Sequence, residues 1–389
     1  MDTPFDLHNP LPLARRLIER PSVTPVDAGA LDVLQTALEQ LGFDCRRMPF
    51  GEVDNLYARR GQAKPCFLFA GHTDVVPPGP DAEWQHPPFA AHTDATQLWG
   101  RGAADMKGAI AAMVASVARF DAKHPNFAGS LAFLITGDEE GPAENGTRAV
   151  LEALAAEGER WDHCLVGEPT NPNQLGDTIK SGRRGSLNVW LTVRGRQGHV
   201  AYPERAENPV PVLIRLLDTL QSRHLDDGHP PFQPSNLEVT TIDVGNTATN
   251  VIPAEARAHF NIRFNVSHTG DELKRWIEDE TALVDMNFDG EIDLLIKISG
   301  EAFLTPAGDF TDLIQDAVED ATGRRPALTT GGGTSDARFI RYYAPVAEFG
   351  LVGATMHQID ERVDIADIET LSTIYTDLLR RYFETPPAC

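Results

Sequence analysis

The chain has 389 residues, and at roughly 100 to 200 residues per domain this length predicts two or three domains, each with its own core. Lys and Arg total 34 against 57 Asp and Glu, and the net charge of −23 argues against binding to nucleic acid or anionic membranes. No run approaches the ~18 consecutive apolar residues of a membrane span, and residues 1–6 lack a signal segment's basic start and apolar core. We therefore expect a cytoplasmic protein.

The cysteines lie far apart and form no Cys-x-x-Cys pair. This spacing is typical of a reducing compartment and disfavours both a disulfide framework and a zinc site made of thiolates. A metal site in this chain would have to use oxygen and imidazole ligands. The cysteines are Cys45, Cys66, Cys164 and Cys389.

Up to about residue 180, short apolar runs alternate with helix-like segments. The pattern predicts helices over 31–41 and 108–120 and strands over 66–70 and 131–135. Buried strands that alternate with helices indicate a mostly parallel sheet sandwiched by helices. The first part of the chain is therefore expected to be an α/β domain.

From residue 186 the apolar residues recur with a period of two. Strands are predicted from 187 to 193, 237 to 244, 256 to 264 and 292 to 298, with a helix over 212–220. A second helix begins with a capping box formed by Thr269 and Glu272. The order β-α-β-β-α-β suits a small two-layer α+β domain.

The α/β pattern resumes near residue 303 and ends in a helix over 366–383. We therefore expect a catalytic domain made of residues 1–183 and 298–389. Residues 184–297 are expected to form a domain inserted into it.

Polar groups follow three apolar strands of the large domain. His72 and Asp74 follow the first strand, Glu139 and Glu140 the second, and Glu168 the third, which starts at residue 164. In an open α/β sheet, ligands bind beyond the carboxyl ends of the strands. These groups are therefore expected to share one crevice.

Two further residues complete a set of metal ligands. Asp105 lies in a loop before a helix, and His357 lies near the C-terminus. Imidazole and carboxylate groups together suit zinc or similar ions. Asp74, two residues from His72, is placed to orient that imidazole rather than to bind metal.

Each of these residues taken alone has a simpler interpretation. A single His or Asp after a strand is usually a cap or a solvated loop group. The chain also repeats the His-Thr-Asp triplet at His92, where no apolar strand precedes it. We assign that second copy to a surface hairpin.

The adjacent carboxylates Glu139 and Glu140 are either an exposed acidic turn or a functional pair. Beside a metal, one can bind the ion while the other accepts a proton from water and returns it to a leaving group. The chain has neither the Gly-x-Ser-x-Gly motif nor a P-loop. This agrees with attack by a metal-activated water, which needs no serine or cysteine nucleophile.

These segments resemble motifs of the dinuclear-zinc aminoacylase and carboxypeptidase superfamily, over nearly the whole chain. The resemblance implies two zinc ions per subunit, with cobalt as an alternative ion in one site. It implies that Asp105 bridges the ions, that His72 and Glu168 complete one site, and that Glu140 and His357 complete the other. The matching segments are 21–25, 71–77, 100–108 and 137–141.

The same resemblance assigns the remaining catalytic roles. Glu139 would be the general acid and base, and the peptide bond between Asp105 and Met106 would be cis. His199 of the partner subunit would stabilise the oxyanion, which requires a homodimer.

Segments 181–186, 198–203, 249–253 and 332–336 resemble the desuccinylase branch of the superfamily, which acts on N-succinyl-LL-2,6-diaminopimelate. Lys180, Arg183 and Arg184 gather positive charge in an acidic protein, either as solvated groups at a domain junction or as partners for a succinyl carboxylate. The substrate-binding residues are then Arg183, Ser186, Tyr202, Asn250, Arg263, Gly333 and Thr334.

Two other functions remain open from the sequence. A related N-acyl amino acid deacylase, of the acetylornithine deacetylase or aminoacylase type, would use the same metals with a different acyl pocket. A noncatalytic dimer that binds a dicarboxylate would have no use for a free carboxylate at Glu139.

Overall fold

The computed structural model describes residues 6–286 and 288–387. Residues 1–5 of the opening segment and Cys389, both used in the expectations above, lie outside this part. Cys45, Cys66 and Cys164 are free thiols. No helix in the described ranges is long and apolar enough to cross a membrane.

The chain divides into two compact units. The first comprises Met1–Ser181, Thr305–Thr329 and Ser335–Cys389, and the second comprises Gly182–Leu304 with Thr330–Thr334. The chain therefore leaves and re-enters the first unit twice. We retain 184 and 297 as proposed limits of an inserted folding domain.

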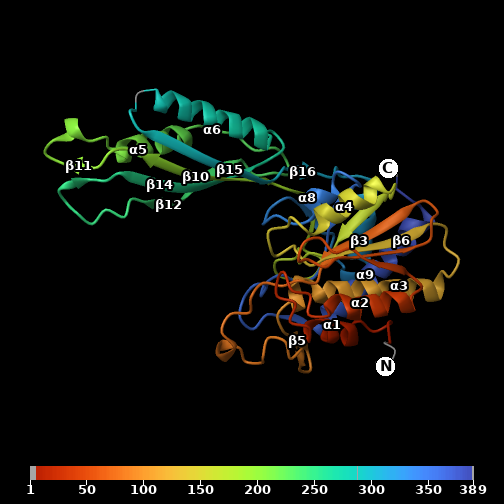
Figure 1. Ribbon diagram of the computed structural model, residues 1–389. Coiled ribbons are helices and arrows are strands. Elements are labelled where there is room, and N and C mark those ends of the chain that lie inside the picture. Colours follow the sequence, from red (N-terminus) through yellow and green to blue (C-terminus); the bar gives the residue numbers. More distant parts are fainter. Residues whose placement is uncertain (1–5, 287, 388–389) are drawn as a thin grey trace. The chain divides into compact units, whose positions relative to one another are not determined.

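The first unit is built on an eight-stranded sheet in the order β1-β2-β6-β3-β7-β18-β8-β17 (Figure 1). The pairs β3/β6, β3/β7, β7/β18 and β8/β17 are parallel, whereas β1/β2, β2/β6 and β8/β18 are antiparallel. The α/β class with a mostly parallel sheet is confirmed. The strands are β1 (Asp44–Arg47), β2 (Leu56–Arg60), β3 (Cys66–His72), β6 (Ser130–Thr136), β7 (His163–Val166), β8 (Thr178–Lys180), β17 (Ala327–Thr329) and β18 (Val346–Glu348).

Helices cover both faces of this sheet, and every residue of β3 and β6 is buried. Helix α3 packs against α9 and α1 on one face, and α4 packs against α8 and β6 on the other. The helices are α1 (Pro10–Ile18), α2 (Ala30–Gln40), α3 (Gly108–Lys123), α4 (Thr147–Ala156), α7 (Asp309–Thr322), α8 (Ala337–Ile340) and α9 (Ile365–Glu384).

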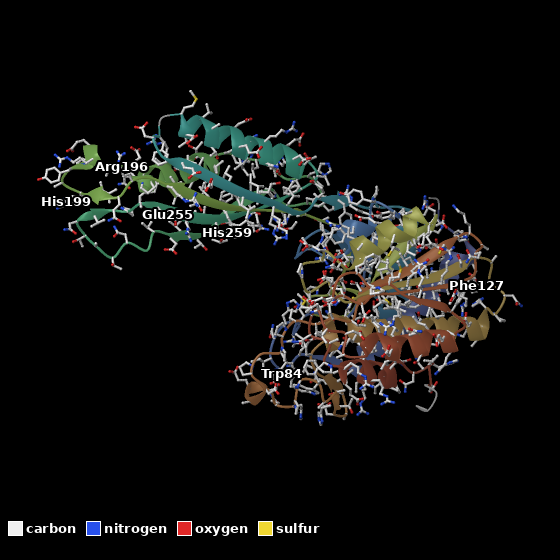
Figure 2. All side chains as sticks on the ribbon, viewed as in Figure 1. Trp84, Phe127, Arg196, His199, Glu255 and His259 are labelled. Atoms are coloured by element: carbon white, nitrogen blue, oxygen red, sulfur yellow. The ribbon has the colours of Figure 1, made fainter. Side chains whose placement is uncertain are left out.

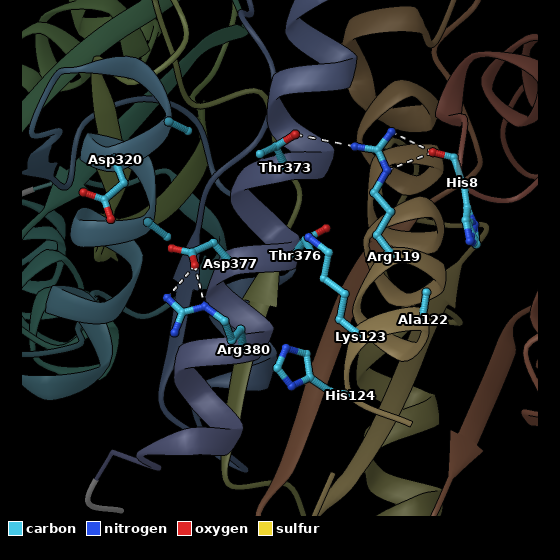
Figure 3. Close-up of a pocket in the computed structure, with 12 residues that line it drawn as sticks. His8, Arg119, Ala122, Lys123, His124, Asp320, Thr373, Thr376, Asp377 and Arg380 are labelled. Carbon is cyan, nitrogen blue, oxygen red and sulfur yellow. Dashed lines mark hydrogen bonds and ion pairs between the residues drawn. The ribbon is translucent and has the colours of Figure 1, made fainter. Parts of the chain in front are cut away.

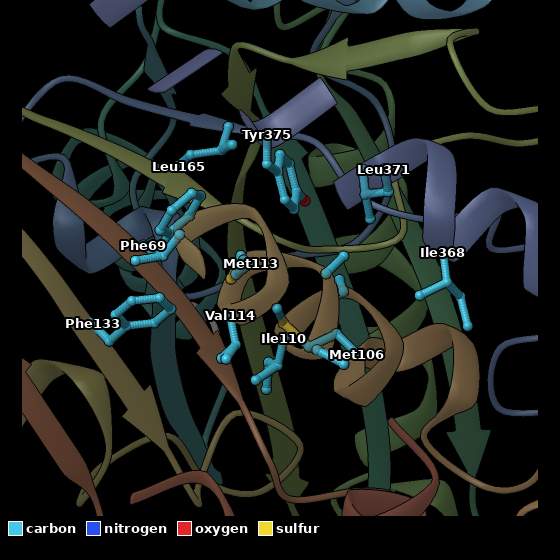
Figure 4. Packing of buried hydrophobic residues seen from close by; sticks show 14 of the residues in the cluster. Phe69, Met106, Ile110, Met113, Val114, Phe133, Leu165, Ile368, Leu371 and Tyr375 are labelled. Carbon is cyan, nitrogen blue, oxygen red and sulfur yellow. The ribbon is translucent and has the colours of Figure 1, made fainter. Parts of the chain in front are cut away.

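The main core lies where α3 and α9 meet the sheet (Figure 4). Phe69 of β3 and Phe133 of β6 pack in a tilted arrangement with ring centroids 5.4 Å apart, and the ring centroid of Phe69 lies 5.6 Å from that of Tyr375 of α9. Ile110 and Val114 of α3 pack beneath them. This packing holds rigid the strand that ends in the candidate site.

The second unit is a four-stranded antiparallel sheet in the order β12-β14-β10-β15, covered on one face by two helices. Val189 and Leu191 of β10 are buried in its core, whereas Trp190 between them is 42% exposed. The capping box of Thr269 and Glu272 and the order β-α-β-β-α-β are as expected. The elements are β10 (Gly185–Arg194), α5 (Pro209–Gln221), β12 (Asn236–Asp243), β14 (Glu255–Phe264), α6 (Gly270–Asp285) and β15 (Glu291–Gly300).

Short elements complete both units. His92 lies in a hairpin of β4 and β5, which confirms the surface position expected for the second His-Thr-Asp triplet. The short strands are β4 (His92–Thr93), β5 (Gln97–Trp99), β9 (Gly182–Arg183), β11 (Gly198–His199), β13 (Val251–Ile252), β16 (Phe303–Leu304) and β19 (Arg362–Asp364). The short helical turns are η1 (Asp81–Glu83), η2 (Ala103–Lys107) and η3 (Pro203–Arg205).

Candidate active site

The candidate site lies where β3, β6 and β7 end. Strand β3 is the middle strand, and its parallel register places His72 opposite Thr136 and Ala70 opposite Val166. The segments that follow these strands therefore begin at the same edge of the sheet. This pairing brings the groups after the three strands together, because parallel strands share one carboxyl edge.

The loop before α3 carries Asp105 to the same edge. Its peptide bond to Met106 is cis, as the resemblance implied. One carboxylate oxygen of Asp105 lies 3.1 Å from Nε2 of His72, and the other lies 3.4 Å from Nε2 of His357. Asp105 thus faces a different imidazole with each oxygen.

Two overlapping groups of side chains present atoms within 4.8 Å of one another. His72, Asp105 and Glu140 form the first group, and His72, Glu139 and Glu168 form the second. Nε2 of His72 lies 3.9 Å from Oε1 of Glu168. The structure therefore gathers the acidic groups that follow β6 and β7, together with Asp105, around the imidazole of His72 at the end of β3.

His357 joins the cluster from the C-terminal part of the chain. Its Nε2 lies 2.8 Å from Oε1 of Glu140. Its backbone has φ of 61°, a left-handed conformation that is uncommon outside glycine. Its side chain is 49% exposed, whereas His72 is fully buried, so His357 borders the open side of the cluster.

Hydrogen bonds outside the cluster fix two of its segments. Nδ1 of His72 donates to the backbone carbonyl of Asp74 at 2.9 Å, which leaves Nε2 available for an ion. The carboxylate of Asp74 accepts from the backbone N–H groups of Glu139 at 3.2 Å and Glu140 at 3.0 Å. Asp74 therefore orients the imidazole through its carbonyl and holds the acidic turn through its carboxylate.

The crowding of carboxylates shifts their protonation. Burial raises the pKa of Glu139 well above its usual range, and the nearby Glu168 carboxylate raises it further. Burial also raises the pKa of Asp74 to about 6, although His72 acts in the opposite direction. Hydrogen bonds to Asp105 and Glu140 raise the pKa of His357 to about 10. The cluster thus favours positive charge at its centre.

This donor set fits divalent metal ions. It combines imidazole nitrogen with several carboxylate oxygens, it contains no thiolate, and its tautomer-fixed His72 directs Nε2 toward Asp105. A cation would also relieve the repulsion among carboxylates that the raised pKa of Glu139 reports.

The expected substrate-binding residues lie in the second unit, and some of them cluster at the start of β10. Ser186 is the register partner of Arg263 on β14. Nη1 of Arg183 donates to the backbone carbonyl of Gly333 at 2.8 Å, and Thr334 follows in the same segment. Burial and the nearby Arg184 lower the pKa of Arg263.

Another set lies beyond the opposite end of β10. His199 of β11 lies with its ring centroid 5.6 Å from that of Tyr202, and the N–H of Val200 donates to the carbonyl of Asn250 at 3.1 Å. Figure 2 shows His199 at the end of the second unit. The second unit thus separates His199, Tyr202 and Asn250 from the arginines.

A different pocket, of about 570 Å³, lies between α3, α7 and α9 (Figure 3). Its Arg119 donates to the carbonyl of His8, and its Arg380 pairs with Asp377 at 2.6 Å. The pocket contains none of the expected catalytic or metal-binding residues. Its two arginines are satisfied by the protein itself, and we do not place the active site there.

Glu361 is a buried acidic residue that the sequence patterns missed. It is 1% exposed and accepts hydrogen bonds from the loop that carries Asp105. The local signal was weak, because Glu361 follows no strand and lies more than 250 positions from its partners. Its position four residues after His357 was the one available indication.

Imidazole and carboxylate groups around a prospective ion, with a further carboxylate beside them, are typical of metal-dependent hydrolases. A model of peptidase family M20/M25/M40 matches residues 68–381, and the chain belongs to this family.

Close relatives match over the full chain. A succinyl-diaminopimelate desuccinylase of Maricaulis maris (strain MCS10) is 74% identical over 388 residues, covering 100% of this chain and 99% of the relative. One from Caulobacter vibrioides (strain NA1000 / CB15N) is 64% identical over 375 residues, covering 96% of each.

Solved structures share the fold. An M20 family metallo-carboxypeptidase from Sulfolobus solfataricus superposes with a TM-score of 0.80 at 17% identity, over 99% of this chain and 100% of that one. A dinuclear metal binding peptidase of the M20 family from Bacillus subtilis gives 0.74 at 17% identity, over 97% and 99%.

Proposed function

We propose that the protein hydrolyses the amide of N-succinyl-LL-2,6-diaminopimelate to succinate and LL-2,6-diaminopimelate. The observation that carries this proposal is the 74% identity, over the full length, to a succinyl-diaminopimelate desuccinylase. The reaction belongs to the synthesis of lysine and meso-diaminopimelate, and we assign the protein to the cytoplasm, where that synthesis occurs.

The site would hold two zinc ions, with cobalt as an alternative in one position. Asp105 would bind both, together with His72 and Glu168 on one side and Glu140 and His357 on the other. The positions of the two Asp105 oxygens, each facing a different imidazole, support this division. When bound, the ions would polarise the amide carbonyl and lower the pKa of the attacking water.

Glu139 would move the proton. It would accept a proton from the water as the new C–O bond forms, and then deliver that proton to the nitrogen of the leaving amine as the C–N bond breaks. Its raised pKa supports this role, because a group that takes and returns a proton works best with a pKa near the working pH. Asp74 supports Glu139 by fixing its backbone.

The second unit would recognise the succinyl group. Arg183, Arg263 and Ser186, near the start of β10, provide cationic and hydroxyl partners for its free carboxylate. Gly333 and Thr334 would offer backbone N–H groups to the same substrate. Tyr202 and Asn250, which flank β11, would contact the substrate together with the histidine of that strand.

His199 of the partner subunit would stabilise the oxyanion in a homodimer. Its distance from Arg183 within one chain supports this, since both residues are assigned to the same small substrate. Strand β12 or β15, the edges of the second unit's sheet, could pair across the dimer.

The test compares two substrates on the zinc-loaded protein. N-succinyl-LL-2,6-diaminopimelate should be hydrolysed and N-acetylornithine hardly at all, and Glu139→Ala should lower turnover at least about 10²- to 10⁴-fold while retaining its metal. Preference for the acetyl compound would reassign the protein to the acetylornithine deacetylase type. Turnover retained at the wild-type level in a fully metallated Glu139→Ala variant would reject the role of Glu139.

A further inference from the structure

The carboxylate of Glu361 is buried beneath the loop that carries Asp105. Oε1 of Glu361 accepts the backbone N–H groups of Ala104 at 2.9 Å and Asp105 at 3.2 Å. Oε2 accepts the N–H of Gly102 at 3.1 Å and Nη1 of Arg101 at 2.6 Å. One side chain therefore satisfies four donors and fixes the backbone immediately before and at Asp105.

The same contacts tie this loop to the turn that carries His357. Nη1 of Arg101 also donates to the carbonyl of Gln358 at 3.2 Å, and the N–H of Gly100 donates to the carbonyl of Glu361 at 2.9 Å. Arg101 is 2% exposed. The segments that carry Asp105 and His357 are thus joined through one buried ion pair.

The loop has little freedom to adopt another conformation. Gly102 has φ of 87°, and a Cβ atom there would lie 2.8 Å from Cγ1 of Val75 and 3.0 Å from Cδ of Lys107. Its N–H group, buried in this position, needs the acceptor that Glu361 supplies.

Stability alone does not account for this pair. A buried ion pair often contributes no more stability than apolar residues of similar volume, because removing two charges from water is costly. A group that holds metal ligands in place has a separate benefit, since it prepares their geometry before an ion arrives.

We propose that Glu361 is a positioning residue of the metal centre, whose carboxylate, paired with Arg101, fixes the separation of the segments bearing Asp105 and His357. The inference rests on the metal ligands of the proposed function. Glu361 itself contacts no ion and no substrate. Its loss should therefore weaken metal binding and distort the geometry of the bound ion.

The test substitutes Glu361→Gln, which keeps the shape but replaces one acceptor oxygen by an N–H donor. Two of the four groups that donate hydrogen bonds to Glu361 would then face the amide N–H of Gln instead of an acceptor. The matched control is Glu369→Gln on α9, whose exposed carboxylate pairs with Arg119 at 2.8 Å. Zn²⁺ affinity of the stripped proteins is measured by competition with a chromophoric chelator, and the Co²⁺-loaded proteins are compared by visible absorption.

Glu361→Gln should raise the Kd for Zn²⁺ about 10- to 100-fold and change the Co²⁺ spectrum, whereas Glu369→Gln should leave both unchanged. Unchanged affinity and spectrum in a folded Glu361→Gln protein would overturn the proposal, even if its apo form melts earlier, because that result shows a structural role only.

If Glu361→Gln does not fold, Arg101→Lys carries the test. It retains the charge but cannot reproduce the guanidinium contacts to both Glu361 and Gln358, so the same rise in Kd is expected. A wild-type protein that binds no Zn²⁺ would refute the proposed metal site and this inference together. If the wild type binds Zn²⁺ tightly and the variants show the same Kd and the same Co²⁺ spectrum, this inference alone would be refuted.

Discussion

The proposed sharing of one active site between two subunits can be tested by mixing two inactive variants. Arg183 lies just before β10, and His199 lies beyond its far end. Ten residues of strand span about 33 Å at ~3.3 Å per residue, much more than the length of a succinyl-amide group. If both residues serve one substrate, they must come from different chains.

The variants are Glu139→Ala and His199→Ala. The first should lower kcat about 10²- to 10⁴-fold, because it removes the proton carrier. The second should lower kcat about 10²- to 10³-fold, because it removes one stabilising contact to the oxyanion. In a hybrid dimer, the chain with Glu139 receives His199 of the partner subunit, and one of the two sites is complete.

Equal amounts, exchanged to equilibrium, give hybrids in about half of the dimers, so about a quarter of wild-type activity should return. A matched control mixes wild type with the double variant, whose hybrids contain no complete site. If the two chains share each site, the activity of this mixture should fall to about a quarter of that of wild type alone. If each site lies within one chain, the activity should fall only to about a half. Absence of recovery after exchange verified with two affinity tags would refute the shared site.

Three further results are expected. Arg183→Ala should raise KM for the succinylated substrate at least about tenfold more than for an acetylated one, because it removes a charge-assisted contact to a carboxylate that only the former carries; equal effects in steady-state kinetics would argue against the acyl assignment. In protein stripped of metal, the raised pKa of His357, about 10 because of Asp105 and Glu140, gives stabilisation that is complete below about pH 6.5 and lost as the pH rises toward 10. The Tm difference between wild type and His357→Gln should shrink over that window, and a constant difference would contradict the ion pairs. Phe69→Ala should lower the free energy of unfolding by about 3 to 5 kcal/mol, since the ring is fully buried among other aromatic rings; a loss below about 1 kcal/mol in urea unfolding would contradict the packing.

Long buried strands could be predicted because their signal is local. The runs that became β3 and β6 are continuous apolar segments, and the groups that follow them meet because parallel strands end together. The period-two pattern of β10 was equally clear, since one face packs against helices and the other remains open.

Other parts of the fold had no such signal. Strands β8 and β17 have three residues each, too few to show a period, and their pairing joins Thr178 to Ala327 across the chain. The antiparallel pairing of β1 with β2 also gave no motif. Whether such short segments form strands depends on the strands they pair with more than on their own sequence.

The same distinction applies inside the candidate site. The positions of His72 and Glu168 could be predicted because His72 ends a strand and Glu168 follows one, but the carboxylates that hold the ligand-bearing segments could not. Asp74 was expected to orient His72, and both its carbonyl at 2.9 Å and its Oδ1 at 3.6 Å lie near Nδ1 of that imidazole. The contact of its carboxylate with the backbone of the acidic turn was not expected. Which oxygen meets which donor depends on the folded backbone, and sequence spacing does not contain that information.

Three buried carboxylates share this supporting task. Asp74 accepts the backbone N–H groups of Glu139 and Glu140. Asp138 accepts those of Glu144 and Asn145. Glu361 accepts those of the loop that carries Asp105. Each accepts two or more backbone N–H groups, and Glu361 also accepts the guanidinium of Arg101. A site crowded with negative charge would otherwise spread apart, because like charges repel strongly where water is excluded. Backbone N–H groups, together with Arg101 at Glu361, thus stabilise the supporting carboxylates and leave the ligand carboxylates for the metal.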